Sequence, residues 1–346
     1  MPTNVTPEYR KAEEAYRKAR EPKDRLDCLK QMLSTIPKHK GTEHLQADIK
    51  RRIKELTEEL AGPKKGARRS GPPISIRPEG AAQVALVGPP NGGKSALHAR
   101  LTGSRAQPGP GPFITQFPEP GMLPFEDVAF QLVDLPSLSG EHMAPWLPST
   151  LQTADAVLLV VDLADPACVE QVEFVLATLA ERKIVLTPRW PAGPPTEPVA
   201  AADELGDPFR LELPTLLVAN KCDQQTDPAE VAVLEELLDV QFPALRVSVE
   251  TGEGLDALAP FLFRNLGVVR VYTKAPGKDP VLDKPFTVRR GDTVLDVARL
   301  VHKDIAETFR FARLWGSGVH DGQQVSGDHT VQDRDVVELH ASRAGV

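Results

Sequence analysis

The sequence of 346 residues lacks the features of membrane proteins, secreted disulfide-rich proteins and metal–thiolate proteins. Its three cysteines, Cys28, Cys168 and Cys222, stand far apart and form no CxxC pair, so neither a disulfide framework nor a thiolate metal site is indicated. No apolar run reaches the roughly 18 residues that span a bilayer, and the polar first ten residues are unlike a secretory signal. We therefore expect a cytoplasmic protein with no membrane partner.

Net positive charge, which a protein that coats nucleic acid needs, is also scarce over most of the chain. The net charge is -7, but residues 1–77 carry 19 Lys and Arg against 11 Asp and Glu. The rest of the chain is therefore acidic by 15 charges. This distribution excludes a uniformly basic surface and predicts that any contact with a polyanion is local.

The first region, residues 1–63, is predicted to form a helical hairpin. Apolar residues recur at steps of three and four in two stretches, and each stretch ends near a proline. They are Leu26, Leu29, Leu33 and Ile36 in the first stretch, and Leu45, Ile49, Ile53, Leu56 and Leu60 in the second. Lys50, Arg51, Arg52 and Lys54 mostly lie off the stripe, where they are either merely solvated or available to phosphates. Residues 64–79 are predicted to form a basic, flexible linker.

The second region, residues 80–266, alternates short apolar runs with amphipathic stretches. The runs VALVG, VAFQLVDLP, AVLLVVD, KIVLT and LLVAN predict an α/β domain with a doubly wound, mostly parallel sheet. A Pro-rich stretch at about 188–214 is interpreted as a surface insertion without chemistry. The third region, residues 267–343, predicts a small α+β module in which Thr293 caps one helix that runs to His302.

A phosphate-binding loop follows the first apolar run. Residues 88–95, GPPNGGKS, satisfy GxxxxGK[ST] between a predicted strand and a predicted helix. Glycines let the backbone amides surround phosphate oxygens, Lys94 would reach the β and γ phosphates, and Ser95 would offer a hydroxyl to Mg²⁺. The alternative is a Gly-rich turn with a chance Lys-Ser pair. The candidate phosphate contacts are Gly88, Gly92, Gly93, Lys94, Ser95 and Ala96.

Two further strand ends complete a nucleotide site in the required order. Asp134 ends the run FQLVD, where its carboxylate would hold the other side of the Mg²⁺ shell. NKCD, Asn220 to Asp223 with Lys221, follows LLVAN, and its last carboxylate can accept two hydrogen bonds from guanine that adenine does not offer. Ser248 and Val249, in SVETGEG, would place backbone amides near the guanine carbonyl. The order of the motifs argues against chance. NKCD favours guanine nucleotide and, together with the C-terminal module, argues against an ATP-dependent kinase.

These motifs together resemble one family. GPPNGGKS, PFITQFPEPGML, DLPSL, NKCD and SVETGEGL resemble the Obg and developmentally regulated (DRG) GTPases, with DRG the closer. The C-terminal text from RVYTKAPGKDP to DVVELH looks like a TGS domain, a ubiquitin-like β-grasp module. The N-terminal hairpin also corresponds to that of DRG proteins. The resemblance implies a P-loop GTPase that acts around ribosomes or RNA, with a regulatory protein as a further possible partner.

Three residue roles come from the resemblance alone. Asn91 matches a loop asparagine that helps to coordinate K⁺ in some relatives. Thr115 matches the switch threonine that closes on Mg²⁺ and the γ-phosphate, which makes it a catalytic candidate beside Lys94. Leu138 stands where many small GTPases have the glutamine that orients the attacking water, so slow turnover, stimulated by K⁺ or by a partner, is implied.

Departures from the family pattern leave a second function open. Ser137 replaces the glycine of DLPG, Ile114 replaces a switch threonine, and Gly92 replaces a loop valine. The small domain inserted in DRG proteins also has no counterpart of sufficient length. The chain is thus either an active GTPase switch or an adaptor that holds GDP or GTP without switching.

The C-terminal module has two interpretations as well. It either contacts nucleic acid or the ribosome through basic residues, or only packs against the GTPase domain. The candidate contacts are Arg289, Arg290, Lys303, Arg310 and Arg313.

Overall fold

The computed structural model describes most of the chain in two compact units. The described residues are 6–19, 22–61, 76–104, 117–139, 143–144, 146–193, 207, 209–224, 229–238 and 240–342. One unit comprises residues 1–73 and 197–210, and the other comprises 74–196 and 211–346. The predicted linker up to residue 75, the centre of the predicted insertion and both Ile114 and Thr115 lie outside the described residues. No helix in the described part of the chain is long and apolar enough to cross a membrane.

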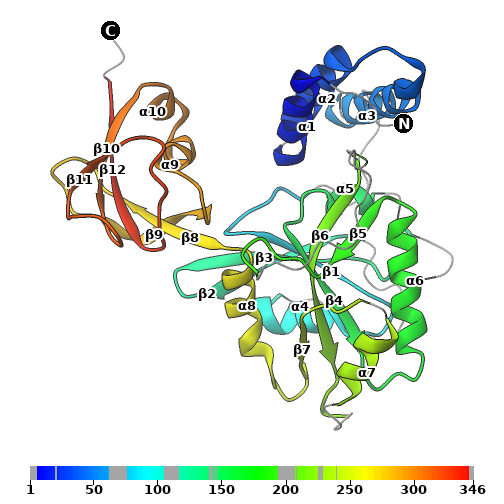
Figure 1. The fold of residues 1–346 in the computed structure, drawn as a ribbon. Helices are drawn as coiled ribbons and strands as arrows, with labels where there is room; N and C mark the ends of the chain where they lie inside the picture. The colour runs from blue at the N-terminus through cyan, green and yellow to red at the C-terminus, as the bar shows by residue number, and fades with distance from the viewer. Residues whose placement is uncertain are drawn as a thin grey trace. The chain divides into compact units, whose positions relative to one another are not determined.

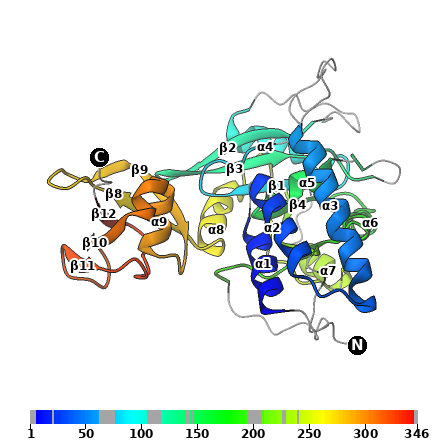
Figure 2. The same ribbon diagram turned by 90° about the horizontal axis from the view of Figure 1, so that it is seen from above.

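The smaller unit is a bundle of three helices, where the sequence predicts a hairpin of two. In Figures 1 and 2 the helices lie side by side: α1 (Pro7–Lys18), α2 (Pro22–Thr35) and α3 (Glu43–Ala61), with the short helix η1 (Lys40–Thr42) before α3. Leu29 and Ile49 from the predicted stripes are fully buried. The unpredicted α1 begins after Thr6, whose hydroxyl accepts the Tyr9 N–H, and buries Tyr9 and Tyr16.

The described flanks of the predicted insertion, residues 188–193, 207, 209 and 210, hold no helix or strand, but each flank buries one aromatic residue, which an insertion lying only on the surface would not do. Phe209 is buried in the helical unit, where its ring meets the edge of Tyr16 at 6.0 Å and the Arg52 guanidinium at 4.2 Å. Arg52 therefore covers an aromatic ring instead of facing open solvent. At the other end of the insertion, Trp190 is buried against Phe261 of the larger unit. The sequence signal that was overlooked is the isolated aromatic residue in each Pro-rich flank.

The first sheet of the larger unit is the predicted parallel sheet with one antiparallel edge strand. Its order is β2-β3-β1-β4-β6-β5, with β7 also on β6. The strands are β1 (Gln83–Val87), β2 (Glu119–Phe125), β3 (Val128–Asp134), β4 (Ala156–Asp162), β5 (Ile184–Thr187), β6 (Leu211–Asn220) and β7 (Ala244–Arg246). The unpredicted β2 contains Pro120 and Pro124, which a strand tolerates at a sheet edge.

Helices cover both faces of this sheet, as the doubly wound prediction requires. Apolar side chains of α5, α6 and α7 share one core with alternate strand residues, and those of α4 and α8 share the other. The helices are α4 (Lys94–Thr102), α5 (Leu147–Leu151), α6 (Cys168–Ala180), α7 (Ala229–Leu237) and α8 (Leu258–Asn265), with η2 (Leu255–Ala257) before α8. The carboxyl ends of the parallel strands meet at one edge, where ligands bind in such folds.

The C-terminal module has the β-grasp arrangement. Its sheet runs β11-β10-β12-β8-β9, with β8 and β12 parallel and the other neighbours antiparallel. The elements are β8 (Val268–Thr273), β9 (Val281–Arg289), α9 (Val294–Val301), α10 (Lys303–Glu307), β10 (Phe309–Trp315), β11 (Gln323–Val325) and β12 (Asp335–Ala341). Thr293 caps α9 in a reciprocal box with Asp296, which confirms the predicted cap.

Candidate nucleotide-binding site

The loop between β1 and α4 has the backbone shape that the phosphate-loop motif predicts. Gly88 has φ 153°, and a Cβ there would lie 2.2 Å from the Val160 carbonyl oxygen. Gly93 has φ 93°, and a Cβ there would lie 2.2 Å from Nδ2 of Asn220. The exposed Asn91 takes φ 60°, which asparagine tolerates better than most residues. Glycine at 88 and 93 is thus required by the backbone itself and by its close neighbours.

Lys94 is folded back over this loop and almost completely buried. Its ammonium donates to the backbone oxygens of Gly88 at 3.1 Å and Pro89 at 2.7 Å, and to Oγ of Ser137 at 2.9 Å. Burial lowers the pKa of Lys94 to about 8, and the nearby Asp134 carboxylate opposes that shift. The contacts place a positive charge at the mouth of an amide-lined loop, which is an anion-binding arrangement.

Ser95 and Asp134 lie together, as the predicted metal pair should. The Ser95 hydroxyl donates to Oδ2 of Asp134 at 2.6 Å. Asp134 is buried at the end of β3, in register with Leu86 of the phosphate-loop strand. No group of three or more His, Cys, Asp or Glu in the described residues could hold a metal. A hydroxyl and a carboxylate do fit Mg²⁺, which takes oxygen ligands and, beside phosphates, needs few of them from protein.

The side chain of Asn220, the first residue of NKCD, forms hydrogen bonds with two neighbouring loops. Nδ2 of the buried Asn220 donates to the Gly92 carbonyl at 3.1 Å, and Oδ1 accepts the Val249 N–H at 3.3 Å. Asn220 therefore joins the phosphate loop to the loop that carries the predicted guanine-carbonyl contacts. In that second loop the buried Ser248 accepts the Thr251 N–H at 3.1 Å.

The charged residues of NKCD differ in exposure. Lys221, at φ 63°, forms an ion pair with Asp162 at the end of β4. Asp223 is exposed and its carboxylate is accessible to a ligand. The sequence analysis missed Asp162, although the run AVLLVVD ends in a carboxylate as the run before Asp134 does.

Among the residues predicted to bind nucleotide or metal, Thr115 alone lies outside the described part of the chain. The structure gathers the others at the carboxyl ends of β1, β3 and β6 and in the loop after β7: Gly88, Asn91, Gly92, Gly93, Lys94, Ser95, Ala96, Asp134, Asn220, Lys221, Asp223, Ser248 and Val249.

The segment after Asp134 is fastened to the core. Leu135 and Leu138 are buried in the core on one sheet face, and the Leu138 N–H donates to the Gly88 carbonyl at 3.2 Å. Leu138 therefore directs its side chain into the core and has no polar group to orient water. Ser137, between these anchors, has no positive φ and so does not need glycine for its backbone conformation here.

A charged cluster joins the first sheet to the C-terminal module. Arg270 of β8 has a side chain only 5% exposed. It forms ion pairs with Glu126, with Asp127 at 2.8 Å and with Asp333 at 2.6 Å, and its guanidinium lies over the Phe263 ring. Glu126 and Asp127 form the turn between β2 and β3, the hairpin that ends in Asp134. The hairpin is thus fixed to the module at its tip.

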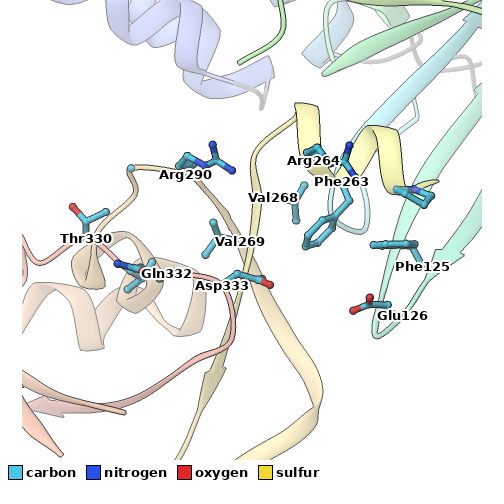
Figure 3. Close-up of a pocket in the computed structure, with 13 residues that line it drawn as sticks. Phe125, Glu126, Phe263, Arg264, Val268, Val269, Arg290, Thr330, Gln332 and Asp333 are labelled. Carbon is cyan, nitrogen blue, oxygen red and sulfur yellow. The ribbon is translucent and has the colours of Figure 1, made fainter. Parts of the chain in front are cut away.

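A pocket of about 680 Å³ lies beside this cluster (Figure 3). Phe125, Phe263 and Val268 contribute its apolar lining, and Arg264 and Arg290 contribute positive charge. Neither arginine has an acidic partner among the residues that the structure describes. No residue of the predicted nucleotide site lines this pocket.

Comparisons with known proteins agree with the fold and with the motifs. Residues 83–188 match the family described as 50S ribosome-binding GTPase, and residues 269–341 match the TGS domain. A solved GTP-binding protein from Pyrococcus horikoshii has 16% identity and a TM-score of 0.50, over 75% of this chain and all of the other, which supports the fold. The class is therefore a P-loop GTPase with a C-terminal TGS domain.

Relatives that match along nearly the whole chain indicate a more specific group within this class. An uncharacterized GTP-binding protein of Methanocaldococcus jannaschii is 28% identical, over 91% of this chain and 92% of the relative. Developmentally regulated G-protein 1 of Arabidopsis thaliana is 25% identical, over 91% of this chain and 90% of the relative. The chain is thus similar, over about nine tenths of its length, to developmentally regulated GTP-binding proteins, which confirms the resemblance predicted from the motifs.

Proposed function

We propose that the chain hydrolyses GTP to GDP and phosphate as a slow switch in the cytoplasm. One observation supports the proposal: Asn220 binds both the loop that holds Lys94 and the loop that holds Ser248, so the predicted phosphate contacts and the predicted base contacts lie close together. In this role Lys94 neutralises the β and γ phosphates, and Ser95 and Asp134 hold Mg²⁺. Bound there, Mg²⁺ would offset the negative charge of the phosphates.

The remaining roles follow the motif positions. Asp223 would accept hydrogen bonds from guanine, with Asn220 and Lys221 shaping that loop and Ser248 and Val249 beside the guanine carbonyl. Thr115 would close on Mg²⁺ and the γ-phosphate. Asn91, exposed on the phosphate loop, would help to hold K⁺. Because Leu138 is buried and apolar, turnover should be slow until K⁺ or a partner stimulates it.

Phosphate release measured with Mg²⁺ and either K⁺ or Na⁺ tests this proposal. We expect slow GTP hydrolysis that K⁺ increases, and a decrease of at least about 100-fold in the Lys94→Ala variant, because Lys94 supplies charge stabilisation in the transition state. Arg182→Ala, a substitution of an exposed basic residue at the end of α6, is the matched control and should leave the rate unchanged. A wild-type rate equal to that of Lys94→Ala, with ribosomes present, would contradict hydrolysis by this site.

A non-switching adaptor remains the second candidate, and the Lys94–Ser137 contact is the observation that favours it. A serine hydroxyl that ties the loop after Asp134 to the phosphate loop could hold that loop in one position. Hydrogen exchange of residues 134–139 distinguishes the two functions. The switch requires protection that differs between GDP and a non-hydrolysable GTP analogue, and the adaptor requires the same protection in both.

We further propose that the TGS domain contacts ribosomal or other structured RNA. The support is the set of exposed basic side chains Arg290, Arg310 and Arg313. Arg289 and Lys303 contribute less, because they pair with Asp155 at 3.3 Å and with Glu307 at 3.7 Å. The alternative, that the module only packs against the GTPase domain, is favoured by the contacts of Arg270.

Ribosome co-sedimentation at several salt concentrations tests the RNA contact. The double variant Arg310→Ala, Arg313→Ala should bind less tightly, and its plot of log affinity against log salt should be less steep by about 2, roughly one unit for each phosphate that is no longer neutralised. Arg299→Ala removes the same charge from a residue paired with Asp296 and is the control. Equal slopes for the wild type and the double variant would show that this surface does not contact RNA.

A further inference from the structure

The hydroxyl of Ser137 lies beside the ammonium group of Lys94, which the proposed function assigns to the β and γ phosphates. Lys94 is the phosphate-loop lysine, and Oγ of Ser137 lies 2.9 Å from its ammonium. An ammonium group has three N–H donors, and its three acceptors here are this Oγ and the carbonyls of Gly88 and Pro89. Two acceptors of one ammonium lie within a few ångströms of each other. A phosphate oxygen that replaced one of the two carbonyls on Lys94 would therefore lie within a few ångströms of Ser137.

The position of Ser137 is held by its neighbours. Leu135 and Leu138 are 1% and 2% exposed, and the Leu138 N–H is bound to the Gly88 carbonyl. The serine side chain thus belongs to a short segment anchored on both sides. Ordering its hydroxyl costs little further entropy, which makes it a preorganised hydrogen-bonding group.

The hydroxyl also has an unused donor. In its contact with Lys94 the Ser137 oxygen accepts, so its own O–H remains available, and it meets no acceptor in the described part of the chain. A γ-phosphate oxygen is a strong, charged acceptor. GDP has no atom at that position, so a hydrogen bond from Ser137 would be made to GTP and not to GDP.

We propose that the Ser137 hydroxyl is a positioning and specificity-determining group that binds the γ-phosphate together with Lys94. In this chain the segment after Asp134 therefore distinguishes GTP from GDP without a glycine at residue 137. The inference rests on the proposed function, because it requires that the site binds guanine nucleotide.

Equilibrium binding of fluorescent GDP and of a fluorescent, non-hydrolysable GTP analogue tests the proposal in the full chain with Mg²⁺. Ser137→Ala should weaken binding of the analogue by about tenfold or more, the effect of one hydrogen bond to a charged group, and change GDP binding by less than about twofold. Ser137→Thr keeps the hydroxyl and should restore most of the preference. Ser139→Ala, two residues along the same segment, should leave both affinities unchanged.

The outcomes separate the two proposals. Equal losses for both nucleotides in Ser137→Ala, or no loss, would overturn the role of Ser137 while leaving the GTPase proposal in place. Tighter binding of the analogue would also overturn it, because the hydroxyl would then be a competitor for Lys94. Wild-type protein that is folded but binds neither nucleotide would overturn both proposals.

Discussion

Replacing Asp223 with asparagine should weaken GDP binding by about 100-fold or more and create affinity for xanthosine diphosphate. The carboxylate can accept two hydrogen bonds, from the ring N–H and the amino group of guanine, whereas a carboxamide offers one acceptor and one donor. Its NH₂ would face the guanine amino group, and a mismatched buried pair is costly. Xanthine carries a carbonyl in place of that amino group, so asparagine complements it.

Displacement of a bound fluorescent GDP by unlabelled GTP, ATP or xanthosine diphosphate measures this change of base preference in Asp223→Asn. Glu250→Gln makes the same change of charge on an exposed residue of the neighbouring loop and should keep the preference for guanine. If Asp223→Asn bound GDP as tightly as the wild type does, the base would have to be recognised elsewhere. Displacement by ATP from the wild-type protein would contradict the guanine assignment directly.

Arg270→Ala should produce the largest loss of stability at the junction between the GTPase and TGS domains. Removing one partner of a buried ion pair costs about 3–5 kcal/mol because the charges left behind are uncompensated. The value here should be near the lower limit, because the side chains of Asp127 and Asp333 are 25% and 35% exposed. Hydrogen exchange of β8 and of the β2–β3 hairpin measures the loss locally, which avoids assuming two-state unfolding of a multidomain chain.

Arg334 supplies the matched control for Arg270. It pairs with the same Glu126, at 3.0 Å, but its side chain is 64% exposed. Arg334→Ala should therefore cost at most about 1 kcal/mol, as exposed ion pairs do. Similar losses in the two variants would show that burial of Arg270 contributes little to the junction.

At acid pH the wild type and Arg270→Ala should no longer differ in the stability of this junction. Burial raises the pKa of Asp333, but its hydrogen bonds with Arg270 outweigh that effect and leave the pKa below its ordinary value; the same balance, with Tyr272 also contributing, holds for Asp127. A carboxyl group with a lowered pKa stabilises the folded state above its unfolded pKa, near 4, and loses that contribution as the pH falls through the folded value. The protection advantage of the wild type should therefore shrink below about pH 4.

The elements that sequence predicted well are those specified by local pattern. The phosphate loop could be found because its glycines, lysine and serine are fixed in spacing within one short segment, in which Gly88 and Gly93 have positive φ. Asp134 and Asn220 could be placed because strand ends of a parallel sheet converge. Thr293 could be assigned as a cap because its partner, Asp296, is three residues away.

The elements that were missed depend on contacts between distant parts of the chain. The stripe of α1 consists of Tyr9, Ala12 and Tyr16, a weak apolar signal that becomes a core only when Phe209 and the other helices are present. Arg270 resembles any basic residue of a strand until the fold brings Glu126, 144 residues away in the chain, against it. Such pairings have no period in the sequence, so pattern analysis alone cannot find them.

The dependence of the helical unit on Phe209 has a consequence for synthesis of the chain. During translation the three helices are made before β5, and the aromatic ring of Phe209 that completes their core follows only after β5. Until then Tyr16 and the apolar part of Arg52 lack one of their packing partners. Until Phe209 is made, the helical unit therefore exposes the apolar patch that this ring covers, a surface for chaperones to protect.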